Sequence, residues 1–210
     1  MLNSQAFRKK HFASHVVGVL TYLVWNVPSP GDYLISVWRG QQLTRRLILV
    51  ARENAANPQV DIDLAAPTKA NHSEDVLSVA VNGKAVFYCS QGSGEYQITV
   101  AQKSKAGEKE IFDSARLKDP DHFIMVPIIA GTYRFSLESK KPSGTILVTS
   151  ASGKKLSPHK LKPQHVTVDK TGLQPSKIEA KPGQPIVFTI RTSDKFAITL
   201  LPQSTTRRKS

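Results

Sequence analysis

The amino-acid sequence predicts an all-β protein built as two tandem Greek-key β-sandwiches. Short runs rich in Val, Ile, Thr and aromatic residues alternate with turns rich in Pro, Gly, Asn and Ser. No segment keeps the roughly 3.6-residue apolar period of an amphipathic helix. The chain has 210 residues, and part of its pattern recurs after about 100 of them. That length is enough for two small domains.

The strands are predicted from their composition and from the turns between them. In the first half they lie at about residues 15–27, 32–38, 45–52, 59–64, 76–81, 84–90 and 95–102. In the second half they lie at about residues 122–127, 132–138, 144–150, 164–168, 176–181, 185–191 and 195–201. Asn82-Gly83 fits a tight turn between two of them, because glycine accepts a positive φ without steric cost. Turns about every 8–12 residues are typical of an immunoglobulin-like or related sandwich.

A repeated motif predicts that the chain is a tandem duplication. Gly31-x-Tyr33-x-x-Ser36 recurs as Gly131-x-Tyr133-x-x-Ser136, and Ile98-Thr99 recurs as Ile198-Thr199. Each tyrosine is expected to pack at the edge of a core, with its hydroxyl bonded to backbone at the sheet corner. The predicted units are a first sandwich over residues 1–104 with a basic N-terminal segment at 1–14, a second sandwich over 105–204, and a basic tail at 205–210.

The run from Gly172 to Phe188 carries a resemblance to a known family. It contains a glycine, Leu173, a proline, an alternating strand, a Pro182-Gly183 turn and a hydrophobic strand. This order resembles the opening of a cupredoxin-like domain, in which an aromatic residue stands where Leu173 is here. The resemblance implies a β-sandwich of the immunoglobulin-like or cupredoxin-like type. It argues against copper, because such sites need two His, a Cys and usually a Met, and none of these residue types follows Phe188.

Two interpretations of the N-terminus stay open. Basic residues at 8–10 precede an apolar run at 12–27, which is the order of a signal peptide or membrane anchor. His15 interrupts that run, and its valines favour a strand. The repeat also favours a strand, because the run would correspond to the predicted strand at 122–127.

The sequence shows no catalytic or metal-binding constellation. His11 and His15 have a helical ligand spacing, but the local pattern is not helical, so an exposed basic N-terminus is expected. The single cysteine, Cys89, excludes an internal disulfide and is expected to be a buried, inert thiol. Asp61 and Asp63 alternate along one strand and are expected on its exposed polar face rather than around calcium. The sequence therefore predicts neither an enzyme nor a cofactor.

The positive charge is concentrated in the second half. The chain has 29 Lys+Arg and 16 Asp+Glu, a net charge of +13, of which residues 140–210 hold 14 basic and 3 acidic residues. This surplus predicts an anionic partner. The residues expected to bind it are Lys140, Lys141, Lys154, Lys155, Lys160, Lys162, Arg207, Arg208 and Lys209.

The favoured function is a non-enzymatic accessory or scaffold subunit of a larger assembly. Its basic sandwich would dock on membrane headgroups or on acidic subunits of a membrane complex. The expected location is then cytoplasmic or peripheral at a membrane face. One alternative is an exported module that binds an anionic polysaccharide, which requires the N-terminus to act as a signal. The other is a nucleic-acid-binding protein, which is less favoured because no aromatic residues are interleaved with the lysines.

Overall fold

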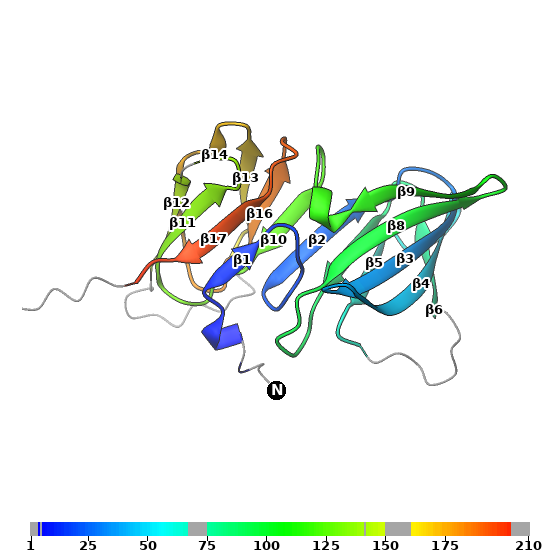
Figure 1. The fold of residues 1–210 in the computed structure, drawn as a ribbon, viewed down its shortest axis with the longest axis horizontal. Helices are drawn as coiled ribbons and strands as arrows, with labels where there is room; N and C mark the ends of the chain where they lie inside the picture. The colour runs from blue at the N-terminus through cyan, green and yellow to red at the C-terminus, as the bar shows by residue number, and fades with distance from the viewer. Residues whose placement is uncertain (1–3, 5, 67–74, 141, 150–160, 203–210) are drawn as a thin grey trace, which may run out of the picture.

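The all-β prediction is confirmed by the computed structural model, which describes residues 4, 6–66, 75–140, 142–149 and 161–202. Apart from two short 3-10 helices, η1 (Ala6–Arg8) and η2 (Ser114–Arg116), every regular element in these ranges is a β-strand. The strands form three sheets, and Figure 1 shows them as two sandwiches lying side by side.

One sheet, here called the shared sheet, runs through both sandwiches. Its seven strands are ordered β14 (Gly172–Gln174), β13 (Gln164–Asp169), β16 (Ile186–Ile190), β10 (His122–Met125), β2 (Thr21–Asn26), β7 (Lys84–Tyr88) and β5 (Gln59–Asp63). The first cover sheet is ordered β6 (Asp75–Ala80), β4 (Gln42–Arg52), β3 (Gly31–Arg39), β8 (Gln97–Ser104) and β9 (Gly107–Asp113). The second cover sheet is ordered β1 (His11–Ala13), β17 (Phe196–Leu200), β11 (Gly131–Leu137), β12 (Pro142–Val148) and β15 (Lys177–Ala180).

The two sandwiches join where β2 pairs antiparallel with β10 (Figure 1). The paired residues are Leu23–Phe123, Tyr22–Ile124 and Val24–His122. Leu23 thus pairs with the residue 100 positions later in the chain. The two flanking pairs correspond to each other with the halves interchanged, because Tyr22 matches His122 and Val24 matches Ile124. An approximate two-fold axis through the Leu23–Phe123 pair produces this pattern. The apolar run near the N-terminus therefore contains a strand at the centre of the shared sheet.

Both cover sheets pack on the same face of the shared sheet. Leu23 and Phe123 lie directly opposite each other and are both fully buried, so their side chains point to one common face. On that face Trp25 contacts Tyr33 of the first cover sheet, with ring centroids 5.4 Å apart. Phe123 contacts Phe196 of the second cover sheet at 5.5 Å. The two cores therefore lie next to each other under one sheet.

The two halves also exchange a strand. β1 pairs with β17 in the second sandwich, whereas β9 pairs with β8 in the first. The hydroxyl of Ser14, after β1, accepts a hydrogen bond from the Phe196 N–H at 3.0 Å. The hydroxyl of Ser114, after β9, accepts one from the Ile98 N–H at 2.9 Å. Residues 1–104 thus do not contain every strand of the first sandwich, and the sheets do not divide at the expected boundary.

The tyrosine motif forms a corner in each half, as expected. Tyr33 and Tyr133 are fully buried. The Tyr33 hydroxyl donates to the carbonyl of Ser29 at 2.6 Å, and the Tyr133 hydroxyl donates to the carbonyl of Ile129 at 2.8 Å. Burial raises the pKa of Tyr133 to about 12. Each motif glycine has a φ near +150° (151° and 148°), a conformation that side chains on L-residues rarely adopt.

Every predicted strand overlaps an observed one, but three observed strands were not expected: β1, β9 and β14. The matching of Ile98-Thr99 with Ile198-Thr199 was wrong by two residues. Tyr33 pairs with Gln102 on β8, whereas Tyr133 pairs with Leu200 on β17, so the structurally equivalent residues there are 98 positions apart. The N-terminal segment is also not simply exposed, because Phe12 is 1% exposed in the core. Among the described residues no helix has the length and apolarity to cross a bilayer.

Candidate binding surface

Only two of the nine basic residues predicted to bind an anionic partner can be placed. Lys140 follows β11, and its ammonium donates to the Lys170 carbonyl at the β13–β14 turn. Lys162 precedes β13, and its carbonyl accepts from the Gln184 side chain at 2.9 Å. The two lysines therefore lie toward opposite ends of β13. Lys141, Lys154, Lys155, Lys160, Arg207, Arg208 and Lys209 lie outside the described residues.

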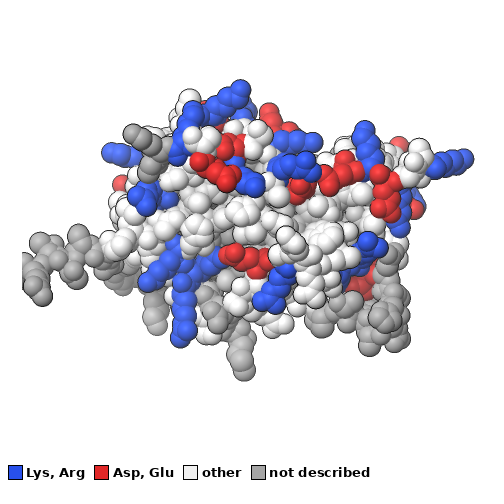
Figure 2. Space-filling model, in the orientation of Figure 1, with Lys and Arg blue, Asp and Glu red and all other residues white. Residues whose placement is uncertain are grey.

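The two halves differ in how their cations are neutralised. Up to Arg116, four described cations form ion pairs: Lys9, Arg45 and Arg52 pair with Glu95, Asp75 and Asp32, and Arg116 pairs with Glu110 and Asp113. Within the described ranges, no lysine or arginine after Arg116 forms an ion pair with a carboxylate. Figure 2 shows that, on this face, the basic side chains are spread around both sandwiches rather than gathered in one patch.

Cys89 and Asp63, which the sequence offers as candidate reactive or metal-binding groups, form hydrogen bonds within the first half. Cys89 is buried and its thiol donates to the Gln91 carbonyl at 3.0 Å, and burial raises its pKa. Asp63 accepts hydrogen bonds from the Ala65 N–H at 3.0 Å and from the Ser90 N–H at 3.1 Å. No group of three or more His, Cys, Asp or Glu side chains suited to a metal occurs in the described part of the chain.

The two N-terminal histidines have different environments. His11 is exposed and one ring nitrogen lies 2.9 Å from the Thr199 hydroxyl. His15 is half-buried, and burial followed by nearby Lys195 lowers its pKa. The expectation of an exposed pair was therefore right for His11 and wrong for His15, because the turn after β1 carries His15 against the second sandwich.

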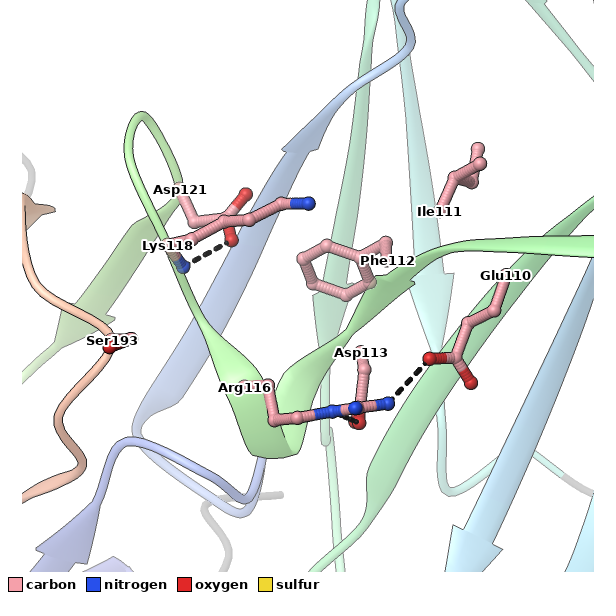
Figure 3. Close-up of a pocket in the computed structure, with 8 residues that line it drawn as sticks. All are labelled: Glu110, Ile111, Phe112, Asp113, Arg116, Lys118, Asp121 and Ser193. Carbon is pink, nitrogen blue, oxygen red and sulfur yellow. Dashed lines mark hydrogen bonds and ion pairs between the residues drawn. The ribbon is translucent and has the colours of Figure 1, made fainter.

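A cavity of about 330 Å³ lies at the junction of the two sandwiches (Figure 3). Its lining residues are Glu110, Ile111, Phe112, Asp113, Arg116, Lys118, Asp121 and Ser193. The Arg116 guanidinium donates to Asp113 at 2.7 Å and to Glu110 at 2.6 Å. The Lys118 N–H donates to the Asp121 carboxylate at 2.9 Å. The charged groups are thus largely occupied with one another, and the arrangement fastens η2 to the ends of β9 and β10.

Asp121 gives this junction a pH dependence. It is 9% exposed, and burial raises the pKa of its carboxyl above the ordinary 3.8, against a smaller opposing effect from Lys118. Between pH 3.8 and the raised pKa, the folded state binds more protons than the unfolded state. The free energy of unfolding therefore falls as the pH rises through this range. Asp121→Asn stays neutral and keeps an oxygen for the Lys118 N–H. We expect it to raise the melting temperature at pH 7 and to change it little near pH 3. Calorimetry of both proteins at the two pH values checks this, and a lower melting temperature at pH 7 would contradict it.

The face of the shared sheet opposite the cover sheets, here called the open face, is built by strands of both halves. Cross-strand pairing aligns its side chains in rows. One row reads Asp63, Tyr88, Tyr22, Ile124, Val187 and His165. The neighbouring row reads Asp61, Val86, Val24, His122, Thr189 and Thr167. The centre is apolar and aromatic, with carboxylates at one end and imidazole or hydroxyl groups toward the other.

Aromatic and imidazole groups of the open face are partly removed from water. The Tyr22 and Tyr88 rings stack with centroids 6.2 Å apart. Burial, together with Tyr88, raises the pKa of Tyr22. Burial, followed by Lys84 and His165, lowers the pKa of His122. The expectation that Asp61 and Asp63 share one face is confirmed, since both belong to these rows.

The sequence carries a signal for this face in two of its strands. Tyr22-Leu23-Val24-Trp25 and Val86-Phe87-Tyr88 are continuous apolar runs, not alternating ones. Continuous runs are typical of strands that are covered on both faces.

Comparison of the chain with known protein families, curated proteins and solved structures finds no match.

Proposed function

We propose that the protein is a non-enzymatic scaffold subunit that docks its basic second half on an anionic surface. The observation that carries the proposal is the difference in ion pairing between the halves. Lys9, Arg45, Arg52 and Arg116 pair with carboxylates, whereas no described lysine or arginine after Arg116 does. Unpaired surface charge of one sign raises the local potential and attracts the opposite charge. Membrane headgroups and acidic subunits of a membrane complex share that chemistry.

We also propose that the two halves descend from one ancestral sandwich of the immunoglobulin-like or cupredoxin-like type. The reciprocal β2–β10 pairing supports a common origin, as do the corners at Tyr33 and Tyr133. The serine hydrogen bonds after β1 and β9 support it as well. After duplication only the second copy would have gained the cationic surface.

Neutralising Lys154, Lys155, Lys160 and Lys162 together to Gln tests the docking function. Near an anionic membrane each lysine contributes about 1 kcal/mol, so we expect binding to phosphatidylserine vesicles to weaken by at least about tenfold. Cosedimentation at physiological salt measures it. A parallel arm with immobilised polyglutamate distinguishes an acidic protein surface from a lipid surface.

The matched control neutralises Arg39, Lys103, Lys105 and Lys109, which removes the same charge from the first sandwich. We expect this control to bind nearly as well as the unmodified chain. Equal losses in both variants would contradict a docking site in the second half. Failure of the unmodified chain to bind either anionic probe at low salt would contradict the function itself.

A further inference from the structure

We propose that the open face is an interface between two copies of this chain, packed face to face. This proposal is independent of the docking function, because it uses the shared sheet and not the lysine-rich segments. The two-fold axis of the dimer would run parallel to the strands, between β2 and β10. The two shared sheets would then form the two layers of an additional sandwich.

The composition of the open face resembles the centre of a protein interface. In a chain with a net charge of +13, its central strands present Tyr22, Tyr88, Ile124 and Val187 at half-buried positions. Lysine and arginine are confined to its margin, as at Lys84. Depletion of charge with enrichment of aromatic residues marks the core of an interface. The continuous apolar runs of β2 and β7 also indicate strands that are covered on both faces.

The order of residues along each row selects a second copy as the occupant. With the axis parallel to the strands, the rotation keeps each row in place but reverses its direction. A residue of one copy then faces the residue of the other copy that lies in the same row, equally many strands away on the other side of the β2–β10 junction. Asp63 of one copy then meets His165 of the other, and Asp61 meets Thr167. Carboxylate acceptors thus face imidazole and hydroxyl donors at both ends. The apolar residues, such as Tyr88 and Val187, meet each other between them.

The alternative axis, along the rows, is disfavoured by charge. It would place Asp61 and Asp63 of one copy against the same two carboxylates of the other. Like charges that face each other across an interface cost several kcal/mol. The row pattern therefore selects both the partner and its orientation.

The size of the face indicates a modest affinity. Six strands about 4.8 Å apart and about five residues long cover roughly 500 Å² per copy. A dimer would bury roughly 1,000 Å² in total, which is at the lower limit for a specific interface. We therefore expect a concentration-dependent dimer with a micromolar dissociation constant.

Analytical ultracentrifugation of the full chain from about 1 µM to 1 mM tests the association. We expect the unmodified chain to pass from monomer to dimer over this range. Ile124→Lys should shift the midpoint at least tenfold upward or abolish the dimer. The control Thr145→Lys adds the same charge on the exposed side of the second cover sheet and should leave the midpoint unchanged. A chain that stays monomeric throughout, or equal effects of both variants, would overturn the proposal.

Cross-linking tests the orientation even if Ile124→Lys fails to fold. Val86→Cys and Thr189→Cys are made separately in a Cys89→Ala background. In the proposed dimer Val86 of one copy faces Thr189 of the other, whereas two Val86 positions are about 14 Å apart laterally. A short bifunctional maleimide should therefore join the mixed variants and leave each single variant largely unjoined. Preferential joining within a single variant would overturn the proposal.

Discussion

Replacing Phe123 with Ala is expected to lower the free energy of unfolding by about 3–5 kcal/mol, the cost of deleting a fully buried aromatic side chain. Phe123 is 0% exposed, and its ring lies 5.5 Å from Phe196 and 6.0 Å from Phe188. It also lies opposite Leu23 at the junction of the sandwiches. Truncation would therefore leave an empty space in the second core, next to the β2–β10 pair that joins the two sandwiches. Urea unfolding followed by tryptophan fluorescence measures the loss.

Phe7→Ala is the matched control for Phe123→Ala. Phe7 is 58% exposed on η1, so the same truncation should change the free energy by less than about 0.5 kcal/mol. The two results together separate a core role from a general effect of losing a phenyl ring. Similar free energies for both variants would show that Phe123 does not carry the packing described above.

The second large effect is expected at the tyrosine corners. Tyr33→Ala and Tyr133→Ala should each cost about 3 kcal/mol through lost packing. Tyr33→Phe and Tyr133→Phe keep the ring but leave a partly buried carbonyl, that of Ser29 or Ile129, without this donor. We expect about 1–2 kcal/mol for each of these.

The corner variants are measured by denaturant unfolding with the same probe. A melting temperature unmoved in the alanine variants would refute the structural role of the motif. Equal losses in the alanine and phenylalanine variants would contradict the division between packing and hydrogen bonding. Binding to the anionic probes should be unchanged in all four, because neither tyrosine is exposed.

The strand positions were predictable because most strands are apolar and bounded by turn residues. β1 and β9 were not, for reasons that their partners explain. β9 alternates Glu108, Lys109 and Glu110 in sequence and is an edge strand, so its pattern is that of a solvated loop. β1 has only three residues and pairs with β17, far away in the chain. No local pattern encodes a strand whose stability comes from a distant partner.

The repeat gave the equivalence of Tyr33 and Tyr133 correctly but not the equivalence of β8 and β17. There the sequence match and the structural match differ by two residues, a shift that keeps the same side chains facing the core. Alternation fixes which face a residue occupies, and a shift of two positions leaves that face unchanged. The register could therefore be read only from the cross-strand pairs.

The candidate surfaces were predictable only in part. The charge surplus of the second half is a property of composition, and it led to the lysine-rich segments, most of which lie outside the described residues. The open face depends on the order of strands in the shared sheet, which places β2 beside β10. Tyr22 and Ile124 are 102 positions apart in sequence and adjacent in the sheet. Their juxtaposition could not be read from either segment alone.

We expect the two halves to unfold as one cooperative unit, because β2–β10 pairing and the exchange of β1 and β9 join them. Differential scanning calorimetry of the full chain tests this most directly. At about 0.7 kcal/mol per residue near 60 °C, one unit of 210 residues predicts a van't Hoff enthalpy of about 150 kcal/mol, equal to the calorimetric one. Tyr33→Ala should shift the whole transition without splitting it. Two transitions, or a van't Hoff enthalpy of about 75 kcal/mol, would contradict cooperative unfolding of the two halves.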